Sequence, residues 1–311
     1  MAESTDEGDK SSPPNVSLEK NLRQPNPFIV QPTSDHTHTA IFLHGLGSNG
    51  EKFGAELIQS GISSRGATLT ATFPGMKFIF PTARKRRSSA FKRATLNQWF
   101  DIASLKDPME RNHLQVDGLI ESADYIRSII SQEMKAIPSQ NILLGGLSQG
   151  CAMAFFVLLS IVFSIGGFVG MSGWLPFYDD FDEIVNPLDP QEADSIFSTD
   201  KETDNADNDP FLQTIRFVRD LLSLDGDKIT TSMRDSTCFQ TPVFLGHGGK
   251  DEKIDCQLSE DAANLFKSLG MDVSWKCYPE LGHWYKIPEE IDDIEEFLQK
   301  KAGFCPTDRY A

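Results

Sequence analysis

The chain is predicted to be an α/β protein with a mostly parallel central sheet that helices cover on both faces. Three observations predict this class. Its 311 residues suffice for one large α/β domain. Strand-like and helix-like segments alternate along the sequence. Finally, an apolar run ends at a serine between glycines, and an apolar segment of helical character follows it, which is the pattern of a strand, a sharp turn and a helix.

The first half of the chain begins with a polar stretch and then alternates. Residues 1–27 are rich in Ser, Pro, Asn and charge, so we expect a disordered tail. Apolar runs predict strands at 39–43 and 76–80, with a short helix at 52–61 between them. Residues 114–136 have the 3.6-residue period of an amphipathic helix, carried by Val116, Leu119, Ile120, Ala123, Ile126, Ile129 and Ile130.

The second half continues the alternation, with one interruption. The predicted elements are a strand at 142–144, a helix after Ser148, strands at 165–171, 243–246 and 273–278, and helices at 256–269 and 288–302. We therefore expect a single domain over residues 28–302, with an acidic insertion at 178–240 and a C-terminal tail at 303–311.

The insertion carries much of the net charge of −16. Residues 179–209 contain twelve Asp or Glu residues and only Lys201 as a base, so part of this segment is expected to be disordered. A helix follows, with one apolar face formed by Phe211, Ile215, Val218 and Leu222. We favour packing of this face on the domain; the alternative is a lid or a wall of an acyl groove.

Composition excludes several classes of protein. The strong negative charge opposes nonspecific binding of nucleic acid. Five scattered cysteines, Cys151, Cys238, Cys256, Cys277 and Cys305, have no metal-binding spacing and are expected to be free thiols. The acidic N-terminus does not resemble a secretory signal, and polar or glycine residues interrupt the apolar run at 152–170. We expect a soluble protein of the cytoplasm or nucleus.

Ser148 is the predicted nucleophile. In Gly146-Leu147-Ser148-Gln149-Gly150, the glycines allow the strand and helix to approach closely, and the turn exposes the hydroxyl next to a helix N-terminus. The alternative is an ordinary glycine-rich turn. In a parallel sheet, ligands bind at the carboxyl ends of strands, which is where Ser148 lies.

A serine nucleophile needs a base and an acid that orients the base. His283 is the predicted base, because it follows the last strand and so gives the order serine, acid, histidine. Asp251 is the predicted acid, and Asp255 is the second choice, with a helix cap as its more ordinary role. His44 and His247 each end a strand and are interpreted as structural hydrogen-bonding groups.

Acyl transfer also needs hydrogen-bond donors for the tetrahedral oxyanion. The backbone N–H of Gln149, directly after the nucleophile, is one predicted donor. The glycine turn after the first strand supplies the second, for which we choose Leu46. The alternative is a plain glycine turn, since it lacks the spacing of a phosphate-binding loop.

Seven segments occur in the order typical of one enzyme family: 42–47, 99–101, 137–139, 144–150, 172–176, 247–251 and 282–283. Together they resemble the phospholipase/carboxylesterase family of α/β-hydrolases, which includes acyl-protein thioesterases and lysophospholipases. The resemblance implies the α/β-hydrolase fold, a triad of Ser148, Asp251 and His283, an oxyanion hole at Leu46 and Gln149, and no cofactor or metal. We also expect Trp174 and Leu175, in the matched segment 172–176, to bind substrate.

The chain departs from the family pattern in three places. Gly249 stands where relatives often have an acidic residue, and Glu252 where they have proline after the catalytic Asp. The insertion is longer than usual. Residues 84–93 carry a basic cluster, which is interpreted as a solvated loop that could pair with the acidic insertion; the alternative is a transient contact with an anionic membrane or substrate surface.

The expected function is hydrolysis of carboxylic thioesters or esters through an acyl-enzyme. By the resemblance, substrates are acylated proteins, lysophospholipids or small esters. We expect the protein to be a monomer or weak homodimer. Two alternatives remain: a carboxylesterase for small or short-chain esters, and a non-catalytic scaffold that only binds ligands.

Overall fold

The computed structural model describes residues 24–187, 209–224, 230, 234 and 236–305. Three expectations lie largely outside these ranges. They are the disordered N-terminal tail, the most acidic part of the insertion, and the C-terminal tail.

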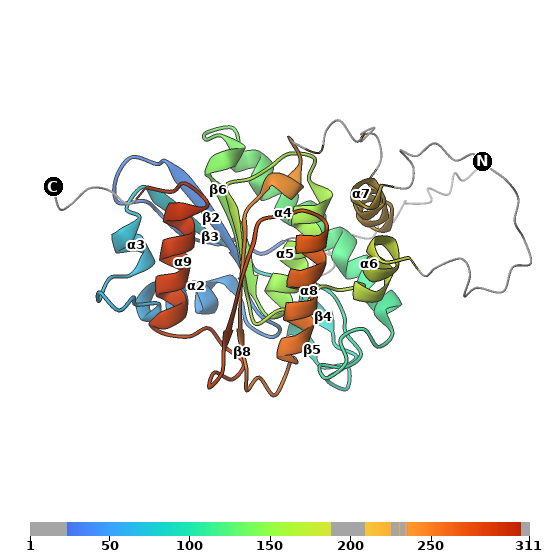
Figure 1. Ribbon diagram of the computed structural model, residues 1–311. Coiled ribbons are helices and arrows are strands. Elements are labelled where there is room, and N and C mark those ends of the chain that lie inside the picture. The colour runs from blue at the N-terminus through green and yellow to red at the C-terminus, as the bar shows by residue number, and fades with distance from the viewer. Residues whose placement is uncertain (1–23, 188–208, 225–229, 231–233, 235, 306–311) are drawn as a thin grey trace, which may run out of the picture.

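A seven-stranded sheet forms the centre of the described structure (Figure 1). Its strands lie in the order β1 (Phe28–Val30), β3 (Met76–Phe80), β2 (His38–Leu43), β6 (Ile142–Leu147), β7 (Gly167–Met171), β8 (Val243–Gly248) and β9 (Val273–Tyr278). Only β1 is antiparallel to its neighbour; the other pairs are parallel. The predicted mostly parallel sheet is confirmed, and β1 is an additional edge strand.

Helices cover both faces of this sheet (Figure 1). One face carries α2 (Gly50–Ser60), α3 (Leu69–Thr72) and α9 (Glu289–Lys300), and the other carries α4 (Val116–Glu133), α5 (Gln149–Ser160) and α8 (Cys256–Ser268). Each face has its own hydrophobic cluster. This arrangement confirms the predicted covering of both faces and explains why the strands are apolar on both sides.

Helix α5 is the most buried helix, because every one of its residues is buried. It packs on β2, β6 and β7 and is covered in turn by α4 and α7 (Pro210–Leu221). Phe155 stacks on Phe168 of β7, with ring centroids 4.7 Å apart. A helix that is apolar all round belongs in such a position, and its burial fixes the direction in which its N-terminus points.

The described part of the insertion contains α6 (Tyr178–Val185) and α7. The predicted apolar face of α7 is buried: Phe211, Ile215 and Val218 have no exposed surface, and Leu222 has 1%. This helix contacts α5 and α6. The favoured expectation, packing on the domain, is therefore confirmed for this helix, whereas α6 was not predicted.

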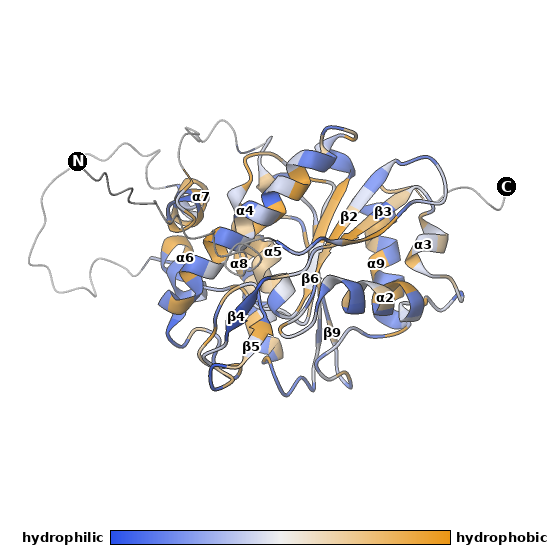
Figure 2. Ribbon diagram, turned by 180° about the vertical axis from the view of Figure 1, so that it is seen from behind, coloured by the Kyte–Doolittle hydropathy of each residue, from blue (hydrophilic) through white to orange (hydrophobic). Residues whose placement is uncertain are grey.

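The basic cluster forms an antiparallel hairpin rather than an irregular loop, with strands β4 (Lys85–Arg87) and β5 (Thr95–Asn97). In Figure 2 the β4 arrow is blue, in contrast to the orange strands β2 and β3 of the central sheet. Arg84 and Arg86 form ion pairs with Glu121 of α4. These pairs anchor the base of the hairpin to the domain.

Short 3-10 helices η1 (Asn112–Gln115), η2 (Ser139–Asn141) and η4 (Cys238–Gln240) complete the regular structure. All five cysteines are free thiols, as expected. Among the residues that the structure describes, no helix combines the length and apolarity required to cross a bilayer.

Candidate active site

Ser148 stands at the apex of the turn between β6 and α5. Its φ of 57° and ψ of −123° are unfavourable for a residue with a side chain, as the predicted sharp turn requires. The flanking glycines permit the turn: a Cβ on Gly150 would lie 2.2 Å from the Leu43 carbonyl oxygen, and one on Gly146 would lie 2.5 Å from the Gly150 backbone. The strained serine is therefore held by close packing of strand and helix.

His283 and Asp251 meet Ser148 in one hydrogen-bonded chain. His283 Nε2 lies 2.9 Å from Ser148 Oγ, and His283 Nδ1 lies 2.7 Å from Asp251 Oδ2. The acid has no exposed side-chain surface, and the imidazole is 13% exposed. With the proton on Nδ1, the ring donates to the carboxylate and leaves Nε2 free to accept the serine proton.

Asp251 is stabilised as an anion in spite of its burial. Desolvation alone would raise the pKa of this carboxyl, but hydrogen bonds from His247 and His283 and from the backbone amides of Ile254 and Lys253 hold its pKa well below the ordinary value. His247 Nε2 lies 3.1 Å from Asp251 Oδ2, so two imidazoles share one oxygen atom. The acid is charged throughout the neutral range.

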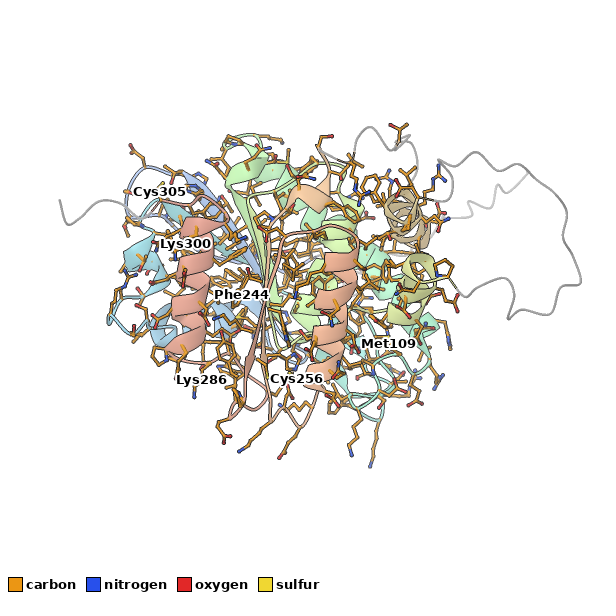
Figure 3. All side chains as sticks on the ribbon, viewed as in Figure 1. Met109, Phe244, Cys256, Lys286, Lys300 and Cys305 are labelled. Carbon is orange, nitrogen blue, oxygen red and sulfur yellow. The ribbon has the colours of Figure 1, made fainter. Side chains whose placement is uncertain are left out.

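Hydrogen bonds between loops keep the three groups together. Lys250 N, next to Asp251 in the chain, donates at 2.9 Å to Leu281 O, two residues before His283. Ser172 Oγ, after β7, donates to Trp284 O at 2.8 Å. Figure 3 places Cys256, where α8 begins, and Lys286, just before α9, along the same lower edge of the molecule. The loops after β6, β7, β8 and β9 thus converge at one end of the sheet.

The amides of Leu46 and Gln149 have no hydrogen-bond acceptor within the described part of the chain, whereas Gly47 N donates to Asn97 O at 2.8 Å. Gln149 N begins α5, where backbone N–H groups have no partner inside the helix. Two hydrogen bonds hold its side chain: Oε1 accepts from Trp99 N at 3.1 Å, and Nε2 donates to Phe100 O at 2.8 Å. Both amides are available to an external oxygen atom.

His44 has a structural role, as interpreted from the sequence. It has no exposed surface; its Nδ1 lies 2.7 Å from Gly45 O, and its Nε2 accepts from Ala83 N at 3.0 Å. Burial lowers the pKa of this imidazole to about 4, so it is neutral. These bonds anchor the turn that carries Leu46.

A cavity of about 540 Å³ opens on Ser148 and His283. Its walls are mainly apolar and come from Phe53, Phe91, Leu96, Leu105, Leu147 and Trp284, together with the turn 45–48 and Lys253. Phe91 and Trp284 are 42% and 38% exposed at its mouth. A larger hollow of about 830 Å³, between residues 25–28 and the hairpin, is lined by no histidine and does not include Ser148. The smaller cavity is the candidate substrate site.

Trp174 and Leu175, expected to bind substrate, lie elsewhere. Trp174 has no exposed surface and Leu175 has 1%, and both belong to the cluster around α5 rather than to the cavity lining. Asp255, the second choice for the acid, caps α8 by accepting from Gln257 N at 2.9 Å. Phe91, Lys253 and the contact of His247 with Asp251 were not predicted from the sequence, although the pair His247-Gly248, four residues before Asp251, was a usable signal.

Within the described ranges, no three His, Cys, Asp or Glu side chains are gathered as metal ligands. The arrangement at Ser148 can instead perform nucleophilic chemistry on a carbonyl group: it combines a hydroxyl, an imidazole, a buried carboxylate and two unpartnered amides beside an apolar cavity.

Comparison with known proteins identifies similar chains. A sequence profile described as phospholipase/carboxylesterase matches residues 24–192 and 227–302. Acyl-protein thioesterase 1 of Gibberella zeae is 30% identical over 279 residues, which cover 88% of this chain and 95% of that protein. Acyl-protein thioesterase 1 of Neurospora crassa is 26% identical, covering 88% and 91%.

Solved structures share the fold. Zea mays acyl-protein thioesterase 2 superposes with a TM-score of 0.61 at 23% identity, covering 89% of this chain and 99% of that one. Arabidopsis thaliana SOBER1 gives a TM-score of 0.59 at 20% identity, covering 85% and 99%. At this identity the superpositions support the architecture.

Proposed function

The chain belongs to the phospholipase/carboxylesterase family of α/β-hydrolases, and on this premise we propose that it hydrolyses carboxylic thioesters or esters through an acyl-enzyme on Ser148. The observation that carries the proposal is the hydrogen-bonded chain from Ser148 through His283 to Asp251, at the mouth of an apolar cavity.

In the proposed mechanism, Ser148 Oγ attacks the acyl carbonyl while His283 Nε2 takes its proton. Asp251 holds the ring through Nδ1 and stabilises the imidazolium that forms. The amides of Leu46 and Gln149 receive the developing oxyanion. His283 then protonates the leaving group where required, and afterwards takes a proton from the water that releases the acyl group.

The lining of the cavity supports acyl chains as substrates. Seven apolar side chains, including Leu46, line the space next to Ser148, and two of them, Phe91 and Trp284, are also exposed to solvent. Together with the thioesterase relatives, this favours acylated proteins or acyl lipids over small polar esters. A short-chain carboxylesterase remains the alternative within the same chemistry.

The direct test is the variant Ser148→Ala, assayed with p-nitrophenyl esters of increasing chain length and with the matching thioesters. We expect kcat to fall by about three orders of magnitude or more, because the remaining groups cannot form the acyl-enzyme. The melting temperature should stay near that of the wild type. Ser128→Ala, an exposed serine on α4, is the matched control and should keep wild-type turnover.

Labelling by a fluorophosphonate probe provides a second readout, independent of the substrate chosen. Labelling that is present in the wild type and absent in Ser148→Ala supports the proposal. Turnover at the wild-type rate in Ser148→Ala would refute it, and absence of labelling in the folded wild type would favour the non-catalytic scaffold.

A further inference from the structure

One cationic side chain, that of Lys253, lines the cavity, whose other walls are apolar or neutral. Among the described lining residues, Lys253 is the one Lys, Arg, Asp or Glu. Its side chain is exposed to the cavity and solvent, and no ion pair of this ammonium occurs within the part of the chain that the structure describes. Glu252, the preceding residue, does not line the cavity. The charge of Lys253 is therefore available to a ligand.

A backbone hydrogen bond fixes the point from which the Lys253 side chain extends. Lys253 N donates to Asp251 Oδ1 at 2.8 Å, and the other oxygen of that carboxylate binds His283. Lys253 thus comes from the turn that carries the acid, on the side of the imidazole. The imidazole is the group that passes a proton to the departing oxygen or sulfur atom in the proposed mechanism. A leaving group that takes this proton would therefore depart close to the turn that carries Lys253.

The remainder of the chain would repel an anionic substrate. The net charge is −16. Near the mouth, however, Lys92 and Arg93 follow Phe91 at the tip of the hairpin, and Phe91 itself lines the cavity. A cation beside apolar, low-dielectric walls attracts an anion more strongly than one in open solvent. Lys253, Lys92 and Arg93 thus place three cations on or next to lining residues of a molecule that is otherwise strongly acidic.

We propose that Lys253 is a specificity-determining residue that favours substrates with a phosphate group a few bonds from the scissile ester, on the leaving-group side. The inference rests on the proposed function, since it names the leaving group of that reaction. A glycerol phosphate ester places its phosphate at this range, whereas the phosphates of an acyl-coenzyme A lie much farther from the thioester.

The test compares two glycerol esters that differ only in the phosphate, and adds a thioester whose phosphates lie farther from the scissile bond. The full chain and its variants are assayed with monooctanoylglycerol, with monooctanoylglycerol phosphate and with octanoyl-coenzyme A, all below their micelle concentrations. The readout is the ratio of kcat/KM for the phosphate ester to that for the neutral ester. In Lys253→Gln we expect this ratio to fall about five- to tenfold, mainly through KM, and in Lys253→Glu to fall further.

Matched variants separate charge from structure. Lys253→Arg should keep most of the wild-type ratio. Lys250→Gln removes an exposed lysine from the same turn, whose partner is Glu280 outside the cavity, and should leave the ratio unchanged. Raising the salt concentration should lower the ratio in the wild type and have little effect on it in Lys253→Gln.

Several outcomes would overturn the inference. An equal change for both glycerol esters in Lys253→Gln would show a structural role. A charge effect confined to octanoyl-coenzyme A would assign Lys253 to a distant phosphate. If the wild type hydrolyses p-nitrophenyl octanoate at Ser148 but neither glycerol ester, this inference fails and the proposed function stands. If the wild type hydrolyses none of these substrates, the proposed function is contradicted as well.

Discussion

At the residue scale, the carboxylate of Asp251 is shared by two histidines. His283 approaches one oxygen from the substrate side, and His247 approaches the same oxygen from within the sheet. His247 has no exposed surface, and its Nε2 also lies 3.1 Å from Ile254 O. Both acceptors require the proton on Nε2, so the ring is a donor that positions the acid.

The variant His247→Phe tests this positioning role. We expect kcat/KM to fall about tenfold to a hundredfold, because a buried anion loses one donor. Since His247 contacts Asp251 and does not line the cavity, the loss should appear in kcat while KM stays close to the wild-type value. His247→Gln, which can restore an N–H donor, should recover part of the lost kcat.

His113→Gln replaces a histidine in η1 that does not line the cavity; it is the control and should keep the wild-type kcat and KM. If His247→Phe loses stability while the folded variant keeps the wild-type kcat, the role of His247 is structural and not positional.

At the element scale, the start of α9 supports the loop that carries His283. Glu290 has no exposed surface; its Oε2 accepts from Lys286 N at 2.7 Å, and its Oε1 has no partner among the described groups. A Cβ on Gly246 of β8 would lie 2.1 Å from that Oε1, so the helix and strand touch at this point. Glycine is required here because the carboxyl group occupies the space.

This carboxyl group predicts a dependence of stability on pH. Burial raises the pKa of Glu290 from 4.5 to about 8. The Asp293 carboxylate adds to this rise, and the hydrogen bond from Lys286 N opposes it. The folded chain therefore holds a proton that the unfolded chain releases. The contribution of Glu290 to the free energy of unfolding is fully present below pH 4.5, and it is lost as the pH rises through about 8. Tyr278 and Tyr285 also face this carboxyl and titrate well above this range.

Glu290→Gln should remove that contribution. Urea unfolding across this pH range should give a flatter curve for the variant than for the wild type, with the variant gaining relative stability toward the alkaline end. Glu289→Gln, an exposed neighbour, should follow the wild-type curve. Parallel curves for wild type and Glu290→Gln would show that Glu290 titrates normally.

At the scale of the whole molecule, two hydrophobic clusters separated by the sheet hold the fold together. The larger one centres on α5, where Phe156 contacts the rings of Phe177 and Phe181 at centroid distances of 5.9 and 6.1 Å. This contact joins α5 to the helix that opens the insertion. Packing of α6 and α7 thereby extends the core on the side remote from α9 (Figure 1).

Phe156→Ala should lower the free energy of unfolding by about 3–5 kcal/mol, because it leaves a cavity in the larger cluster. Chemical denaturation followed by circular dichroism measures this change. Met134→Ala, which alters an exposed side chain after α4, should stay within about 0.5 kcal/mol of the wild type. A cost near zero for Phe156→Ala would mean that α6 is not part of the cooperative core.

The sequence by itself determined the order of the elements and the position of the sharp turn at Ser148. Periodicity located β3 and β9 at the observed bounds and placed α4, α5, α7 and α8 within a few residues. The glycine-flanked Ser148 marked its turn because only a narrow set of residues fits such a backbone. These signals are local, so a single chain reveals them.

The tertiary structure decided which residues meet. Trp174 and Leu175 follow a strand at the correct end of the sheet, yet they turn into the core, whereas Phe91 and Lys253 reach the cavity from a hairpin and a loop with no strong pattern of their own. His247 gained its contact with Asp251 only through a turn of four residues. Direction of side chains and contact between distant loops depend on packing, and no local periodicity records them.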